Sequence, residues 1–281
     1  MELPEIEITV RRLGRALLGA EVESAFAPGL VTMKSFEPPL EVLKGRRATG
    51  MRRRGKMLVL DFDGLALLVH TMAAGRLQLF EKRASSRDRR SRLLVRLVDG
   101  RELRLREFGT RERAWAKLLP ADALDKEDMV ASLGPEAWPA PPPEEFAALV
   151  AQPRHLHPLL RDQRVIAGIG RSWVDEILWR ARLSPFSQGS DLDDEEVKRL
   201  QESCEQTLDE AIGHYEETIG DTIPDRLPMP LLVHNRQGEP CPRCGAKLEA
   251  VFFKEHTTTY CPVDQTRGRV LKDRRLSRLL K

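Results

Sequence analysis

The sequence predicts an α+β protein with a β-rich N-terminal domain and a helical C-terminal domain. At 281 residues the chain is long for one small domain, and 41% hydrophobic residues suffice for two cores. Strand signals fill the first half, helical periodicity fills the second, and a proline-rich stretch separates them. We therefore expect a helix plus β-sandwich domain over 1–130, a linker over 131–150, a helical domain over 151–232, and a cysteine hairpin with a basic tail over 233–281.

The first expected element is an amphipathic helix that starts almost at the N-terminus. It opens at a Leu-Pro pair and stops at Gly19, and its apolar residues at helical spacing are Ile6, Val10, Leu13 and Leu17. The carboxylates of Glu2 and Glu5 follow directly behind the α-amino group of Met1. Most chain termini are loose, whereas a terminus held in this way has a fixed position. Its amine can therefore serve as a reagent.

Two hairpins of strand character follow the helix. Each has two apolar runs joined by Asp-Gly, and the paired runs are 57–62 with 65–70 and 93–97 with 102–108. Asp-Gly between apolar runs is a strong signal for a tight hairpin turn. These segments predict a β-sandwich or barrel-like domain.

Beyond a proline-rich linker at 134–144 the pattern becomes helical. The segments with helical periodicity are 146–151, 156–166, 172–181 and 194–214. Gly168-Ile169-Gly170 lies between two of these segments and is typical of a helix-turn-helix.

The net charge is only +3, but the basic residues are concentrated in three clusters, 51–56, 82–92 and 267–281. Clusters of this kind are typical of surfaces that bind nucleic-acid phosphates. A solvated face explains any one cluster alone. Three clusters together with a metal-type hairpin favour phosphate binding.

No apolar run approaches the ~18–20 residues of a membrane span, and the charged N-terminus does not have the pattern of a signal peptide. We therefore expect a cytoplasmic protein that acts at the bacterial nucleoid. Four cysteines, three of them clustered late in the chain, favour a metal site over a disulfide framework.

Two short knuckles predict that metal site. Cys241-Pro-Arg-Cys244 and Cys261-Pro-Val-Asp264 are separated by sixteen residues. Paired knuckles bring four side chains around one tetrahedral ion, and zinc accepts an oxygen donor in the fourth place. We predict a Cys3Asp site with one structural zinc, and a metal-free ribbon held by its apolar core is the alternative. His256 falls at the expected hairpin tip and is the weaker ligand candidate.

These motifs resemble those of the formamidopyrimidine-DNA glycosylase / endonuclease VIII family, in the same order along essentially the whole chain. The matching segments are Glu2-Leu3-Pro4-Glu5, Arg54-Gly55-Lys56, Phe108-Gly109, Leu133-Gly134-Pro135-Glu136, residues 162–178 and the two knuckles. Segment 162–178 is the most specific, because it is similar to the family's helix–two-turns–helix element, which grips DNA phosphates. The resemblance implies this element in the helical domain and a zinc-ribbon-like hairpin at the C-terminus.

The resemblance also implies base-excision repair of damaged double-stranded DNA by a monomeric enzyme. Family members flip the damaged nucleotide out of the duplex and attack its C1′ with their N-terminal amine. A Schiff base forms, and the strand is then cut by elimination. Structural zinc is the one cofactor implied.

The nucleophile is the main departure from the family pattern. Family chains usually begin with proline once methionine is removed, whereas here Glu2 follows Met1 directly. Because Glu2 is too large for methionine removal, we expect Met1 to be retained and its α-amine to replace the proline nitrogen. With an ordinary pKa of about 7.7–8.0, such an amine is partly unprotonated near neutrality. The alternative is an inert Met1, with Glu2 merely capping the helix.

The same resemblance assigns roles to further residues. Glu2 protonates the sugar ring oxygen, Glu5 helps to position the terminus, and Lys56 contacts the phosphate beside the lesion. Arg54 and Arg267 belong to the basic clusters and count as further DNA contacts.

Arg106 and Phe108 are expected to fill the gap that a flipped base leaves. They are two residues apart in an expected strand, so they share a face, with Glu107 opposite. Phe108 would wedge between bases and Arg106 would meet the orphaned base. A core role for Phe108 is the alternative. The family's wedge methionine aligns with Ala73, and a substitute at neighbouring Met72 is the alternative.

Three expected phosphate-binding positions also depart from the family pattern. Arg171 replaces an asparagine and still binds a phosphate with two hydrogen bonds. His157 and His256 replace basic residues and bind phosphate well only when protonated, which would make DNA binding pH-sensitive.

The short segment between Ile219 and Arg236 leaves little room for a long lesion-capping loop. The resemblance is therefore closer to the endonuclease VIII branch, with oxidised pyrimidines or abasic sites as expected substrates. Two alternatives stay open. One is a catalytically weakened protein that binds damaged or abasic DNA without cutting it. The other is a zinc-ribbon transcription or translation factor, which explains the knuckles and tail but not the N-terminal match.

Overall fold

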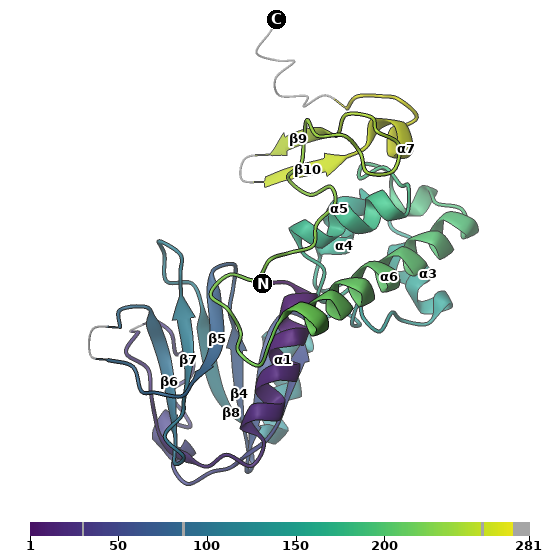
Figure 1. Ribbon diagram of the computed structural model, residues 1–281. Helices are drawn as coiled ribbons and strands as arrows, with labels where there is room; N and C mark the ends of the chain where they lie inside the picture. The colour runs from purple at the N-terminus through teal and green to yellow at the C-terminus, as the bar shows by residue number, and fades with distance from the viewer. Residues whose placement is uncertain (30, 86–87, 254–255, 272–281) are drawn as a thin grey trace, which may run out of the picture. The chain divides into compact units, whose positions relative to one another are not determined.

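The computed structural model describes residues 1–29, 31–85, 88–253 and 256–271, without the side chains of Phe253 and His256. Contacts divide the chain into two compact units (Figure 1). Unit 1 comprises Met1–Ser132 with Ile212–Pro228, and unit 2 comprises Leu133–Ala211 with the residues from Met229 onward. None of the helices in the described part of the chain has the length and apolar character of a membrane span.

Unit 1 begins with helix α1 (Leu3–Leu17), which confirms the helix expected at the N-terminus. Proline in its first turn suits a position whose N–H has no intrahelical partner. The buried apolar face consists of Leu3, Ile6, Ile8, Leu13 and Leu17, and the helix packs on strand β2. Burying each such side chain stabilises the unit by roughly 1.5–3 kcal/mol.

Two four-stranded antiparallel sheets follow. The first has the order β2-β3-β4-β8, with bounds Ala48–Arg54, Met57–Phe62, Leu65–His70 and Trp115–Pro120. The second has the order β1-β6-β7-β5, with bounds Val22–Phe26, Ser91–Leu97, Glu102–Glu107 and Gly75–Phe80. Short helices η1 (Leu40–Leu43), η2 (Ala121–Lys126) and α2 (Asp128–Ala131) complete the connections.

Side chains from both sheets form one continuous core, so the sheets form a sandwich. The first sheet contributes Leu58, Leu60, Leu67 and Val69, and the second contributes Leu77, Leu93, Val95, Leu103 and Leu105. Strands β3 and β4 are buried on both faces, which explains their apolar residues at successive positions.

Unit 2 is helical and ends in the cysteine hairpin. Its helices are α3 (Pro143–Val150), α4 (Leu156–Arg161), α5 (Arg171–Arg180), η3 (Gly189–Asp191) and most of α6 (Asp194–Thr218), whose residues from Ile212 onward belong to unit 1. The hairpin pairs β9 (Glu249–Phe253) with β10 (His256–Tyr260), and helix α7 (Pro262–Thr266) follows.

Helix α4 ends at Arg161, earlier than the helical pattern over 156–166 predicted. The side chain of Asp162 accepts the backbone N–H of Arg164, which turns the chain away from the helix axis. The turn packs against Gly134, where a Cβ atom would lie only 2.5 Å from the carbonyl oxygen of Val165. A glycine is therefore required at this position.

Candidate active site and DNA-binding elements

The N-terminal α-amine of unit 1 is held against a backbone carbonyl. The amine of Met1 donates a hydrogen bond to the carbonyl oxygen of Met72, in the loop between β4 and β5. Met1 is half-buried and packs against the core of the unit. The amine that the sequence singled out as a candidate nucleophile therefore occupies a defined position.

Burial lowers the pKa of this amine below its ordinary value of 8.0. The carboxylates of Glu5 and Glu2 oppose this shift, because a nearby negative charge favours the ammonium form. The cations Arg76 and Lys56 add to the shift. The result is an amine with a larger free-base fraction near neutral pH than an exposed α-amine has.

Glu5 lies beneath the amine in the interior of the unit. It is 3% exposed and accepts hydrogen bonds from the backbone N–H of Glu2 at 2.8 Å and from the hydroxyl of Tyr215 at 2.9 Å. Burial raises the pKa of the Glu5 carboxyl, and the charge of Glu2 raises it further. The two hydrogen bonds oppose the shift because they stabilise the ionised form.

Lys56 lies in a two-residue turn between β2 and β3, where Arg54 pairs with Met57. Gly55 takes a φ of 56°, a left-handed conformation that favours glycine at this tight turn. The Lys56 charge lowers the pKa values of both the Met1 amine and the His70 imidazole. Lys56 therefore lies within electrostatic reach of the α-amine.

His70 ends strand β4 beside the same site. Its Nδ1 accepts the backbone N–H of Met72 at 2.9 Å, and its ring stacks on Trp115 with centroids 5.6 Å apart. Burial lowers the pKa of His70 to about 4, and the positive charges of the N-terminus and Lys56 contribute. The ring is therefore neutral at physiological pH.

Sequence reasoning missed His70, Arg76 and Tyr215. A polar residue at the end of an apolar strand is the signal that could have identified His70. Arg76 directly follows the Gly75 turn and shows no comparable signal. Tyr215 is 210 residues away from Glu5 in the chain, so no local pattern could connect them.

Arg106 and Phe108 lie on one side of unit 1, as their spacing predicted for a strand. The Arg106 guanidinium lies 4.9 Å from the Phe108 ring centroid, and that of Arg90 lies 5.1 Å away. Arg106 also donates to Asp225 at 2.7 Å and to Gln78 at 3.1 Å. Phe108 is partly exposed just beyond β7, so its ring is not a core residue.

In unit 2, two glycine-bearing turns lead into helix α5. The Gln163 side chain accepts the backbone N–H of Gly168 and donates to the carbonyl of Ile169, which fixes the turn. Gly168 has a φ of 111°, and Gly170 precedes the helix. Arg171 is exposed at the first position of α5, where the positive end of the helix dipole adds to its charge.

His157 differs from the expectation that it contacts DNA. It is 4% exposed, and its Nε2 lies 3.2 Å from the hydroxyl of Thr258 and 3.3 Å from a carboxylate oxygen of Asp175. The partners come from strand β10 and helix α5, so the imidazole joins these elements inside unit 2. We correct its role to a structural one, because a buried and bonded ring cannot reach a phosphate.

The three remaining residues that were expected to contact DNA are Arg54, Arg267 and His256. Arg54 ends β2 and is partly buried, and Arg267 is exposed at the end of α7, where it has a φ of 53°. His256 begins β10, and its side chain lies outside what the structure describes.

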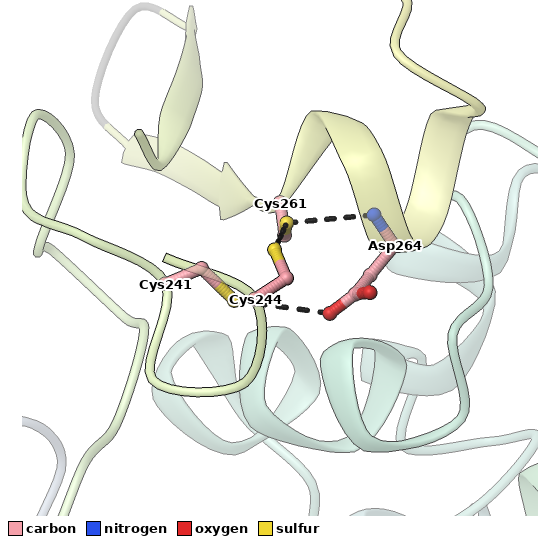
Figure 2. Close-up of side chains that lie close together, drawn as sticks. All are labelled: Cys241, Cys244, Cys261 and Asp264. Atoms are coloured by element: carbon pink, nitrogen blue, oxygen red, sulfur yellow. Dashed lines mark hydrogen bonds between the residues drawn. The ribbon is translucent and has the colours of Figure 1, made fainter. Parts of the chain in front are cut away.

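The metal ligands predicted from the two knuckles come together. The ligand atoms of Cys241, Cys244, Cys261 and Asp264 all lie within 4.8 Å of one another (Figure 2). The Cys244 and Cys261 sulfurs are 3.4 Å apart, and the Cys241 sulfur lies 3.8 Å from Asp264 Oδ2. Tetrahedral zinc with bonds of about 2.0–2.3 Å places its ligands about 3.3–3.8 Å apart. The donor set and spacing therefore fit one structural zinc.

Helix α5 supports the metal site. Arg243 donates to the carbonyl of Trp179 at 3.0 Å, lies 4.1 Å above its indole ring and contacts Asp264 at 3.3 Å. The indole N–H of Trp179 lies 3.4 Å from the Cys241 sulfur. These contacts orient the ligands from outside the coordination shell.

A second set of contacts joins α5 to the hairpin, and we call Asp175, Glu176, His157 and His234 the hairpin support. Glu176 accepts the backbone N–H groups of Leu232, Val233 and His234 at 3.0, 2.9 and 2.8 Å. Asp175 accepts the N–H of Thr259 at 3.0 Å and lies 2.7 Å from His234 Nδ1. Both carboxylates are buried.

Three domain families match the chain. The N-terminal domain of formamidopyrimidine-DNA glycosylase matches residues 1–111, and its H2TH domain matches residues 133–222. The zinc finger found in formamidopyrimidine-DNA glycosylase and isoleucyl-tRNA synthetase matches residues 238–267.

Similar proteins match over nearly the whole chain. A formamidopyrimidine-DNA glycosylase from Roseiflexus is 34% identical over 276 residues, which cover 93% of this chain and 98% of that protein. One from Pelotomaculum thermopropionicum is 31% identical over 277 residues, covering 94% and 98%. The Lactococcus lactis enzyme in complex with DNA containing an abasic site has a TM-score of 0.85 at 26% identity, covering 95% of this chain and all of that one. Its complex with DNA containing N7-benzyl-Fapy-dG gives the same TM-score, identity and coverage.

Proposed function

The chain belongs to the formamidopyrimidine-DNA glycosylase family, and on this premise we propose that it is a bifunctional DNA glycosylase and abasic-site lyase of base-excision repair. Its nucleophile is the α-amine of Met1. The observation that carries this proposal is the partly buried amine whose pKa is lowered beside two carboxylates and two cations. Such an amine has the free lone pair that attack on C1′ requires.

Met1 and Glu2 supply the nucleophile and the acid of the reaction. The Met1 nitrogen bonds to C1′ and gives one N–H proton to the departing base, whose bond to C1′ breaks with its electron pair. Glu2 delivers a proton to the ring oxygen as the sugar opens, so that a protonated imine between Met1 and C1′ results. The Glu2 carboxylate then takes a proton from C2′, and the electron pair freed at C2′ expels the 3′ phosphate.

Cations on both units would bind the DNA backbone. Lys56 is placed to contact the phosphate beside the lesion, because its charge already reaches the Met1 amine. Arg171 offers a guanidinium at a helix N-terminus, which favours anions. Arg54, Arg267 and His256 remain proposed contacts on the strength of the family pattern.

Phe108 and Arg106 would occupy the gap left by the flipped nucleotide. Phe108 is partly exposed, and Arg106 stacks against it on the same side of unit 1. This supports a wedge rather than a core role for the ring.

We favour abasic sites and oxidised pyrimidines as substrates. Ile219, Ile223 and Leu227 are buried in a cluster with Ile8 and Tyr215, so residues 219–227 pack onto unit 1. Residues packed in this way cannot form a long loop over an enlarged purine. The relatives named for formamidopyrimidine make oxidised purines the competing substrate class.

The decisive experiment is strand incision with Glu2→Gln beside the unaltered protein, on duplexes carrying an abasic site, an oxidised pyrimidine or an oxidised purine. We expect the variant to lose about 100-fold or more in rate, since a positioned acid contributes about 10²–10⁴. Glu41→Gln, at an exposed acid in η1, is the control. Borohydride trapping and peptide mass spectrometry should locate the adduct on Met1, and an adduct on a lysine would refute the proposed nucleophile.

A protein that only binds abasic DNA is the second candidate, favoured by Met1 in place of the family's proline. It predicts tight, lesion-selective binding with no incision in any of the three duplexes. In either case affinity should fall steeply between about 50 and 200 mM salt, because phosphate contacts release counterions. A salt-insensitive complex would contradict both.

A further inference from the structure

Met72 has an unusual backbone beside the reactive amine. Its φ is 53°, in the left-handed region that non-glycine residues seldom adopt. Such a residue persists only where its surroundings hold it there, and such residues cluster at functional sites. The contacts of the loop between β4 and β5 therefore hold Met72 in this conformation.

Three hydrogen bonds fix the loop. The N–H of Met72 donates to His70 Nδ1 at 2.9 Å, and the N–H of Gly75 donates to the carbonyl of Thr71 at 2.8 Å. The carbonyl of Ala74 accepts the N–H of Phe108 at 3.1 Å. A Cβ at Gly75 would lie 2.4 Å from the Thr71 carbonyl oxygen, so only glycine allows this closure.

These hydrogen bonds fix the direction of the Met72 carbonyl. The carbonyl oxygen accepts a hydrogen bond from the Met1 amine. A primary amine rotates freely about its bond to Cα, unlike a ring nitrogen. In the free-base form it has two N–H groups and one lone pair. An acceptor that holds one N–H fixes where the lone pair points.

We propose that His70 is a positioning residue, which holds the backbone of Met72 so that the Met72 carbonyl orients the primary amine of Met1 for attack. This inference rests on the proposed function, since it assumes that the Met1 amine is the nucleophile. His70 does not touch the reacting atoms in this role. It acts through the backbone of Met72, whose N–H it binds and whose carbonyl accepts the amine, and it replaces by hydrogen bonding the rigidity that a proline ring would supply.

The charged and titratable groups around the amine come from every element packed against it. They are Glu2 and Glu5 from α1, Lys56 from the β2–β3 turn, His70 from β4, Arg76 from β5 and Tyr215 from α6. Because His70 stays neutral, its Nδ1 keeps the lone pair that the Met72 N–H needs across the working pH range.

The test compares two variants of His70. His70→Phe keeps a ring to stack on Trp115 but lacks the acceptor, whereas His70→Asn offers an amide oxygen near the position of Nδ1. We expect His70→Phe to slow single-turnover imine formation on abasic DNA by about 10- to 100-fold, as misplacement of a reacting group does. His70→Asn should recover most of this rate. The dissociation constant for abasic DNA should stay within about twofold in both.

Other outcomes would overturn the proposal. If His70→Phe weakens DNA binding as much as it slows imine formation, His70 is a DNA contact. Failure of His70→Asn to recover the rate would also contradict the hydrogen-bond role.

A second readout separates this inference from the proposed function. With ¹⁵N-methionine labelling, the α-amine nitrogen can be titrated by NMR without DNA. Loss of the carbonyl contact removes a hydrogen bond to the ammonium form, so the amine pKa should fall in His70→Phe and return in His70→Asn. Identical titrations in all three proteins would overturn the positioning role. If unaltered protein forms its adduct elsewhere, the proposed function fails while this titration still decides the contact.

Discussion

The amine site of unit 1 and the hairpin support of unit 2 both bury carboxylates, yet they use them differently. Glu176 accepts three backbone N–H groups, whereas Glu5 accepts one N–H and one hydroxyl close to Glu2 and the Met1 amine. Burial raises the pKa of both carboxyls. The groups that bond to Glu176 are three fixed backbone donors. In the amine site they are groups that exchange protons.

The difference teaches that a shifted pKa does not by itself identify a reactive site. Backbone N–H groups cannot ionise, so the three donors that bond to Glu176 hold the carboxylate in a structural role. In the amine site several protonation states lie close in energy, because an amine, two carboxylates and two cations are within mutual reach. This arrangement at the Met1 amine is the one suited to proton transfer and nucleophilic attack.

The largest expected effect comes from removing Glu176. Glu176→Ala leaves three backbone N–H groups without their acceptor inside unit 2, so we expect a loss of about 3 kcal/mol in the free energy of unfolding. Urea unfolding measures this loss. Glu195→Ala, at an exposed acid of α6, is the control and should change stability by no more than about 0.5 kcal/mol. A similarly small change in Glu176→Ala would mean that the hairpin does not depend on this carboxylate.

The next effect concerns the oxygen ligand of the metal site. Asp264→Cys should slow the release of zinc to a chromophoric chelator by about tenfold, because thiolate is the softer ligand, and Asp264→Ala should accelerate it. Both rates are read in the same absorbance assay. Equal release from all three proteins would show that Asp264 is not a ligand.

A smaller effect is expected at the amine site, where Tyr215→Phe removes one hydrogen bond to Glu5. That bond favours the ionised carboxylate, so its loss raises the Glu5 pKa further. The acid limb of the rate profile for imine formation should move to higher pH, with a loss of about three- to tenfold near the limb. Tyr260→Phe removes a buried hydroxyl from unit 2 and should leave the limb in place. Matching shifts in both variants would indicate a general loss of structure.

Local patterns predicted much of this molecule. The 3.6-residue period identified α1, Asp-Gly turns identified two hairpins, and the spacing of the knuckles identified the metal ligands. In each case the residues that interact are close in sequence or follow a fixed geometric repeat.

Contacts between distant segments could not be predicted in this way. His157 was expected to contact a DNA phosphate, but its Thr258 partner is 101 residues away and the ring is buried. Asp225 holds Arg106 across 119 residues, and nothing local to either residue indicates it. The hydrogen-bonding capacity of such side chains is visible in sequence, whereas the partner depends on the complete fold.

The loop that joins β4 to β5 has a consequence for how such proteins diverge. The carbonyls of Met72 and Ala74 in this loop accept hydrogen bonds from the Met1 amine and from the N–H of Phe108, respectively. A mutation that reshapes the loop therefore moves the proposed nucleophile and the proposed wedge in a single step. Under the proposed function, we expect lineages with a different N-terminal residue to change this loop and Phe108 together.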